Sequence, residues 1–230
     1  MNSPARRKLL FPYVGGNDLG GSHISSLKLV RMLQDIDEFE PIIGLHRPQG
    51  RLAAYIREQG LEFVPLTAAG NLLEPRTRRR NGWLGGGFAY ARKTLPALLR
   101  FIAENNISIV HTNDGRMHAS WALPTALSRA SHVWHHRGDP EGIGINMIAP
   151  VLADWIITVS RFAKPRRPVR PIDHKWSVVH SPFDPNSQVD RGVARAALLA
   201  ELGVPPETRF LAYVGELIDR KRPVHFVDVV

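Results

Sequence analysis

The sequence predicts an α/β protein with a doubly wound, mostly parallel sheet. Short apolar runs alternate along the chain with segments whose apolar residues recur at helical spacing. Several of the apolar runs end in loops that contain glycine or aspartate, as strands of such sheets do. The 230 residues are 43% hydrophobic and 22% charged. This composition can bury a core, and the length fits one large domain plus part of another.

The first predicted strand, Lys8–Val14, leads into a glycine-rich loop and then a helix. Ser22 is expected to cap this helix, whose apolar stripe starts at Ile24. Gly60 is expected to end the second helix. The other strands predicted for this domain are Pro41–Leu45, Leu61–Leu66, Ile107–Thr112, Ser131–His135, Trp155–Val159 and Trp176–Val179, and the other helices are Leu52–Gln59, Met117–Ser128 and Ile143–Leu152.

The alternation breaks near residues 181–190, where prolines cluster without apolar periodicity. We therefore expect a first domain over residues 1–181, a linker over 182–192, and the start of a second α/β domain over 193–230. That start would hold a helix, a strand and a second helix, and a single strand cannot form a sheet. The second domain is thus expected to be truncated, unless the segment packs on the first domain as an extension. Its predicted elements are Ala194–Leu202, Arg209–Val214 and a helix from Pro223.

Composition excludes several classes of function. The chain has no cysteine, so disulfide scaffolds, thiolate zinc sites and a cysteine nucleophile are excluded. The formal charge of +9 predicts an anionic partner, and nucleic acid, an acidic membrane or a phosphorylated small molecule all qualify. Residues 71–100 hold seven basic side chains and one acidic one, and residues 161–175 hold six and one. The charge is therefore concentrated in two segments.

The loop from Gly15 to Gly21 is the first candidate site. It follows the first strand and precedes a helix, and ligands of open α/β sheets bind at that edge. Glycines let a ligand approach the backbone, and the helix N-terminus favours an anion. The P-loop and Rossmann glycine patterns are both incomplete, because Ser22 stands where a P-loop has lysine. The position indicates an anion-binding loop, and a merely flexible loop is the alternative.

Two further strand ends carry polar side chains. His135 and His136 adjoin Arg137, so at least one imidazole should face the crevice beside a group able to hold an anion. The alternative is that these histidines are hydrogen-bonded core residues. Their spacing with His132 does not match a zinc motif, so no metal site is predicted.

Asn113 and Asp114 end a neighbouring strand, where they could line the crevice or cap the next helix. Lys221 lies in a basic run before the helix from Pro223. A cation opposes the helix dipole there, which suggests a phosphate-binding role; a solvated basic turn is the alternative.

Taken in order, these segments resemble a GT-B glycosyltransferase of the family 4 type. The loop with Gly20 and Gly21 resembles that family's first βα loop, and Val133–Arg137 resembles its histidine-containing strand end. Ala153–Ser160 and Val178–Asp184 are similar to its next strand and to its crossing between domains. Tyr213–Lys221 is similar to the opening of its donor-binding domain.

The resemblance implies a Rossmann-like acceptor-side domain and retaining, metal-independent transfer of a sugar, of the hexosyltransferase class, from a nucleotide-sugar donor. It implies no cofactor beyond that donor. It places Gly20 and Gly21 at the donor diphosphate, His135 at the reaction centre and Lys221 on the leaving group. Arg137, with Asn113 and Asp114, would bind the acceptor. Glu216 stands where the family has arginine, and the family's nucleotide pocket and paired glutamates would lie beyond Val230, so this chain alone is expected to be inactive.

The basic stretch that contains Arg76, Arg78, Arg79, Arg80 and Trp83 mixes cations with aromatic residues. Such a mixture suits the surface of an anionic membrane, although a solvated loop is equally compatible. We therefore expect a cytoplasmic protein that is peripheral at the inner membrane face, and the resemblance implies a lipid-linked or saccharide acceptor. The alternative is a non-catalytic basic module for anionic lipid or nucleic acid. No nucleic-acid-binding motif supports a nucleic-acid partner.

Overall fold

The strands carry near-continuous apolar runs, as expected for a parallel sheet covered on both faces. The computed structural model describes residues 6–66, 72–73, 87–181, 189–215, 217 and 219–229. Within them, seven strands form one sheet in the order β3-β2-β1-β4-β5-β6-β7, and every neighbouring pair is parallel. This confirms the predicted doubly wound α/β sheet. The strands are β1 (Arg7–Gly15), β2 (Phe39–Arg47), β3 (Val64–Pro65), β4 (Ile107–Thr112), β5 (Ser131–His136), β6 (Trp155–Thr158) and β7 (Trp176–Val178).

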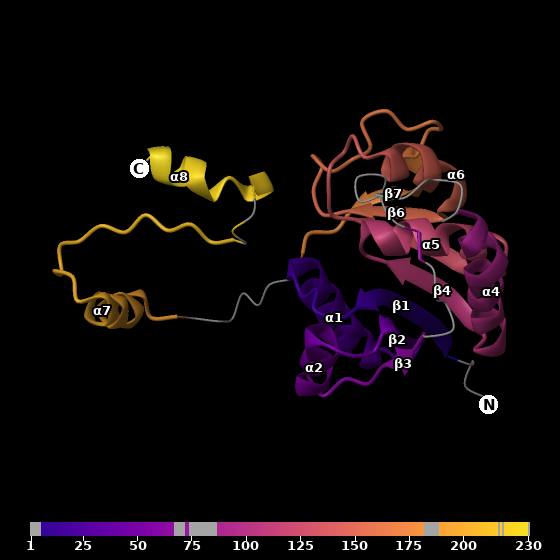
Figure 1. The fold of residues 1–230 in the computed structure, drawn as a ribbon, viewed down its shortest axis with the longest axis horizontal. Helices are drawn as coiled ribbons and strands as arrows, with labels where there is room; N and C mark the ends of the chain where they lie inside the picture. Colours follow the sequence, from indigo (N-terminus) through magenta and orange to yellow (C-terminus); the bar gives the residue numbers. More distant parts are fainter. Residues whose placement is uncertain are drawn as a thin grey trace. The chain divides into compact units, whose positions relative to one another are not determined.

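Helices cover both faces of this sheet (Figure 1). Phe11 and Tyr13 of β1 pack in one buried cluster with residues of α1 and α2, whereas Leu10 packs in another with residues of α4 and α5. Because successive side chains of a strand point to opposite faces, β1 anchors both layers. The helical segments of this part are α1 (Gly21–Gln34), α2 (Arg51–Glu58), the π-helical turn η2 (Tyr90–Thr94), α4 (Leu95–Glu104), α5 (Gly115–Ala126), the π-helical turn η3 (Gly144–Ile148), α6 (Ala149–Leu152) and the 3₁₀ turn η4 (Asp173–Lys175).

The chain divides into two units, Met1–Pro182 and Phe183–Val230. The second contains α7 (Arg191–Leu202), the 3₁₀ turn η5 (Asp219–Lys221) and α8 (Pro223–Val229). The strand predicted at Arg209–Val214 is wrong, since these residues form no strand. A strand needs a hydrogen-bonding neighbour, and no other strand lies in the described part of this unit.

The helix after β1 starts earlier than predicted. Gly20 is its N-cap residue, and Ser22 lies inside the first turn, so the prediction of Ser22 as the cap is wrong. The His23 ring explains the difference, because its Nδ1 accepts a hydrogen bond of 3.1 Å from the backbone N–H of Gly20. Among the described helices, none is long and apolar enough to cross a bilayer.

Candidate functional site

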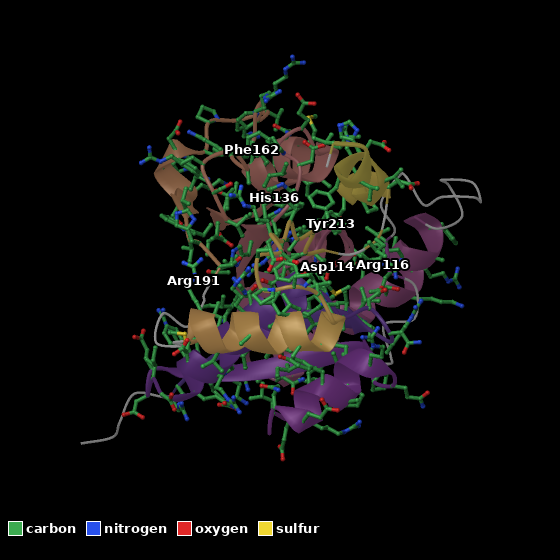
Figure 2. The ribbon with its side chains drawn as sticks, turned by 90° about the vertical axis from the view of Figure 1, so that its left-hand side faces the viewer. Asp114, Arg116, His136, Phe162, Arg191 and Tyr213 are labelled. Atoms are coloured by element: carbon green, nitrogen blue, oxygen red, sulfur yellow. The ribbon has the colours of Figure 1, made fainter. Side chains whose placement is uncertain are left out.

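The carboxyl ends of β1, β4 and β5 meet at one edge of the sheet, where the order of the strands reverses direction around β1. In open α/β sheets this switch point is where ligands bind. Helices α1 and α5 also begin at this edge, so the free backbone N–H groups of their first turns lie there. Figure 2 labels Asp114 and His136, which come from the ends of β4 and β5. The predicted site residues of the first unit all lie at this edge.

The glycines of the first loop have two different roles. Gly15 has φ of +77°, and a Cβ there would come within 2.2 Å of the carbonyl oxygen of Arg47. The fold therefore requires glycine at this position. At Gly20 and Gly21, by contrast, a Cβ would meet no atom of the described residues within 4 Å. These two glycines leave open space beside the N-terminus of α1, where a ligand could approach the backbone.

His135 lies at the end of β5 and is only 3% exposed. Its ring contacts that of His111 edge-on with centroids 5.3 Å apart, and His111 contacts Phe11 in the same way, so His135 lies on the α1 side of the sheet. Neither ring nitrogen has a hydrogen-bond partner among the described residues. Burial, together with the nearby charge of Arg137, lowers the pKa of His135 to about 3. The imidazole is therefore neutral at physiological pH and has one donor and one acceptor to offer.

Arg137 follows β5 and links three parts of the crevice. Its Nη1 donates to Ser25 Oγ of α1 and to Ser181 Oγ, which follows β7, at 3.1 Å each. Its Nε is buried and has no acceptor among the described residues. Burial lowers the pKa of the guanidinium. The cation is thus held in place with an N–H group still available to an acceptor.

Asn113 and Asp114 differ in what they contribute. Asp114 is the N-cap of α5, and its Oδ1 accepts from the backbone N–H groups of Arg116 and Met117 at 2.9 and 3.0 Å. Burial raises the pKa of Asp114, against the stabilising effect of these N–H groups. The Asn113 amide lies against His111, while its Oδ1 is buried without a donor among the described residues. An acceptor-binding role for either residue stays a prediction.

The other histidines of β5 belong to a network on the opposite face of the sheet. Thr112 Oγ1 lies 2.6 Å from His118 Nδ1 and 3.0 Å from His132 Nε2, and the His118 ring stacks on Trp134. His136 Nε2 lies 3.0 Å from the carbonyl oxygen of Asp139. In the part of the chain that the structure describes, no group of three or more histidine or carboxylate side chains is placed to hold a metal ion.

Two predicted sets of residues do not belong to the described part of the first unit. Lys221 belongs to the second unit, where it ends η5 and its carbonyl oxygen accepts from the Tyr213 hydroxyl. The predicted membrane-binding residues Arg76, Arg78, Arg79, Arg80 and Trp83 lie outside the described residues.

Sequence reasoning missed four polar residues beside this crevice. The Tyr13 hydroxyl is 2.8 Å from Ser26 Oγ in the core, His23 binds the N-cap of α1, and Ser25 holds Arg137. A signal was present, because Ser25 and Ser26 are small polar residues on the buried face of an otherwise apolar helical stripe. Polar side chains on such a face need partners, which here are Tyr13 of β1 and Arg137, which follows β5.

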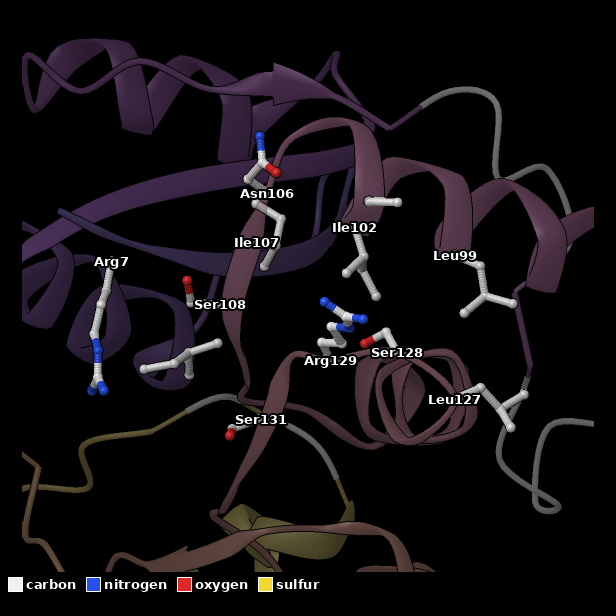
Figure 3. Close-up of a pocket in the computed structure, with 12 residues that line it drawn as sticks. Arg7, Leu99, Ile102, Asn106, Ile107, Ser108, Leu127, Ser128, Arg129 and Ser131 are labelled. Carbon is white, nitrogen blue, oxygen red and sulfur yellow. The ribbon is translucent and has the colours of Figure 1, made fainter. Parts of the chain in front are cut away.

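A cavity of about 840 Å³ lies at the opposite edge of the sheet, near the amino ends of β4 and β5 (Figure 3). It is lined by Ile102, Ile107 and Leu127, with Arg7 and Arg129 among its polar residues. The C-terminal ends of α4 and α5 lie here, and their free carbonyl groups disfavour an anion. This edge therefore lacks the helix N-termini that lie beside the crevice.

No family model and no curated protein matches the chain. Solved structures do resemble it. HepE from Anabaena, in complex with UDP and glucose, matches with a TM-score of 0.59 and 15% identity over 86% of this chain and 50% of HepE. A glycosyltransferase from Rickettsia africae matches with a TM-score of 0.60 and 15% identity over 90% of this chain and 54% of its own length.

MurG from Acinetobacter baumannii matches with a TM-score of 0.50 and 12% identity, over 79% of this chain and 47% of MurG. The chain thus spans about half the length of the solved structures it matches. At such identities the likeness shows the fold, which is the Rossmann-like fold found in GT-B glycosyltransferases.

Proposed function

We propose that this chain forms the acceptor-side half of a GT-B glycosyltransferase of the family 4 type, together with the start of its donor-binding domain. The reaction is transfer of a hexose from a nucleotide-sugar to an acceptor, with retention of configuration and without a metal ion. The observation that carries the proposal is the crevice itself. His135 and Arg137, each with an unused polar atom, lie at the strand ends beside the open N-terminus of α1.

The glycine loop suits the phosphates of the donor. Open space beside Gly20 and Gly21 lets an anion reach the first N–H groups of α1, and the helix dipole favours negative charge there. HepE has been solved in complex with UDP-glucose, which makes this nucleotide-sugar a reasonable first probe. Lys221, in the second unit, is proposed to neutralise the diphosphate as it leaves.

His135 suits the transferred sugar. A neutral imidazole can donate to one hydroxyl or carbonyl group and accept from another without carrying a charge. Its low pKa means that it does not act as a cation near neutral pH. Arg137, held by two serine hydroxyls, is proposed to bind a polar or anionic group of a saccharide or lipid-linked acceptor.

The test is a transfer assay on the full-length gene product that contains this chain, with nucleotide-sugar donors including UDP-glucose. We expect turnover that EDTA leaves unchanged, and a product whose anomeric configuration matches the donor by NMR. His135→Ala should lower kcat at least a hundredfold, an effect of the size found when one transition-state contact is removed. The matched control is His174→Ala, because His174 is exposed on η4.

Full activity of the His135→Ala enzyme would contradict the assignment of the site. Absence of turnover with every donor, combined with binding of anionic lipid or nucleic acid, would favour the non-catalytic basic module instead.

A further inference from the structure

A second surface of the first unit combines exposed apolar side chains with unpaired cations. We call it the η3 surface and define it by two segments, the helix formed by η3 and α6 and the loop of residues 160–171 that follows β6. Phe162 on this loop, labelled in Figure 2, is 75% exposed. The other exposed apolar residues of the surface are Ile143, Met147, Val151 and Val169.

The helix contributes a stripe rather than scattered residues. Ile143, Met147 and Val151 are four positions apart, so they lie on one face of the helical segment 143–152. The opposite face is used by the core, where Ile145 and Ala149 pack with Trp134 and Ile156. The helix is therefore apolar on both sides, although one side faces solvent, and such a helix face normally has a partner.

The loop lies directly beside this helix. The backbone N–H of Val169 donates to the Asn146 carbonyl at 2.8 Å, and that of Arg167 donates to Asn146 Oδ1 at 2.7 Å. Asn146 is itself fixed by a hydrogen bond from its Nδ2 to the carbonyl oxygen of Pro140. These bonds place the side chains of the loop along the edge of the exposed stripe.

The cations of the loop fall into two groups. Lys164 pairs with Asp173, and Arg166 pairs with Glu141. Arg161, Arg167 and Arg170 are exposed and have no ion-pair partner among the residues that the structure describes. The surface therefore presents three uncompensated positive charges next to an apolar stripe.

We propose that the η3 surface docks on an anionic lipid bilayer, with the apolar side chains at the acyl boundary and the three arginines at the headgroups. Basic residues that border an exposed apolar helix face are the chemistry of interfacial membrane binding. A second copy of this chain fits poorly, because it would bring the same arginines together. A nucleic acid would use the arginines but would leave the apolar stripe without a role.

This inference does not depend on the proposed function. It also concerns residues other than the basic stretch predicted at Arg76–Trp83, which lies outside the described part of the chain.

The experiment is vesicle co-sedimentation of the protein with phosphatidylcholine alone and with phosphatidylcholine containing phosphatidylglycerol. We expect binding that is at least tenfold stronger to the anionic vesicles and that weakens as salt is raised. Changing Arg161, Arg167 and Arg170 together to Gln should lower the anionic partition coefficient about a hundredfold, since each cation near the surface contributes roughly a factor of five. Met147→Ser with Phe162→Ser should lower it about tenfold or more.

Matched controls carry the same chemical changes at other exposed positions. Lys28, Arg51 and Arg129 changed together to Gln remove the same charge, and Met32→Ser with Leu127→Ser removes comparable apolar area. Both controls should bind like the parent protein, and circular dichroism should show that every variant is folded. Equal binding by test and control variants would overturn the proposal. So would absence of vesicle binding, or sedimentation that instead shows self-association through this surface.

Discussion

The glycines at the sheet edge are of two kinds. One kind is required by the backbone conformation of the fold, and the other leaves space in which a ligand could bind. Gly15 has a positive φ and no room for a Cβ against Arg47. Gly20 has an extended backbone, with φ of −147° and ψ of 178°, that any residue can adopt, and Gly21 starts a helix. The two kinds of glycine are indistinguishable in the sequence, where they are six positions or fewer apart.

We expect Gly20→Ala and Gly21→Ala each to change the free energy of unfolding by no more than about 1 kcal/mol, with Gly21→Ala the more favourable of the two because alanine is the better helix former. Gly15→Ala should destabilise by about 1–3 kcal/mol, because the chain must keep a left-handed backbone and move the Arg47 strand end. Urea unfolding followed by circular dichroism measures both effects.

The variants Gly20→Ala and Gly21→Ala also test whether the glycine loop binds the nucleotide-sugar donor. Affinity of the full-length protein for UDP-glucose, measured by calorimetry, should fall at least tenfold in Gly20→Ala and Gly21→Ala while stability is kept. Unchanged affinity in both variants would mean that the open space beside α1 is not used by this donor.

At the scale of elements, α5 depends on its cap. Asp114 Oδ1 accepts two backbone N–H groups of the first turn, so Asp114→Ala should cost about 1–2 kcal/mol of unfolding free energy. Asp114→Asn should recover most of that loss, because an amide oxygen can accept the same two bonds. Thermal unfolding of the two variants and the parent checks this order.

The variants Asp114→Ala and Asp114→Asn also distinguish a capping role of Asp114 from a role in acceptor binding. If Asp114→Asn restores stability but the transfer rate stays low, the carboxylate has a role in the acceptor site. If Asp114→Asn restores both the stability and the transfer rate, capping of α5 is the role of Asp114.

Most elements of the first unit could be predicted because each strand is an apolar run with a clear end. Ile107–Thr112 and the helix Ile143–Leu152 match the structure at both bounds. The helical segment from Gly87 to Glu104 was not predicted, since Arg92, Lys93 and Pro96 mask its apolar spacing and a π-helical stretch interrupts it at Tyr90–Thr94. The strand at Arg209–Val214 was predicted wrongly because a local apolar run cannot reveal whether a pairing neighbour exists.

The site was predictable only in part, because the local sequence does not reveal which distant residues become partners in the fold. His135 and Arg137 could be placed at a strand end from their position after an apolar run. Ser25 and Ser181 could not be linked to Arg137, because they lie 112 and 44 residues from it and only the folded sheet brings them together.

At the scale of the whole molecule, the core holds an unusual number of neutral histidines. Burial lowers the pKa of His46 and of His132 to about 4, and that of His135 to about 3. Burial also holds the pKa values of His111 and His118 well below the usual 6.5. All five side chains are at least nine-tenths inaccessible to solvent. Protonating them requires charges to be placed in the core or the fold to open.

The sign of the effect follows from proton uptake. Below pH 6.5 the unfolded chain binds protons on these histidines while the folded chain does not, so stability falls as the pH falls. Each such histidine lowers the free energy of unfolding by about 1.4 kcal/mol for each unit that the pH falls below 6.5. Five of them acting together can remove on the order of 10 kcal/mol by pH 5, comparable with the total stability of a typical domain.

We therefore expect the first unit to unfold on acidification between about pH 6 and pH 4, well above the range in which carboxylates alone would unfold it. Urea unfolding at half-unit steps of pH should show a steep fall in unfolding free energy below pH 6.5 and a plateau above it. His46→Gln removes one titrating ring, and its amide oxygen can still accept from Trp121 Nε1, so the slope should decrease by about one proton. A protein equally stable at pH 5 and pH 7 would show that the buried histidines are not neutral in the fold, and the neutral role assigned to His135 would fail with them.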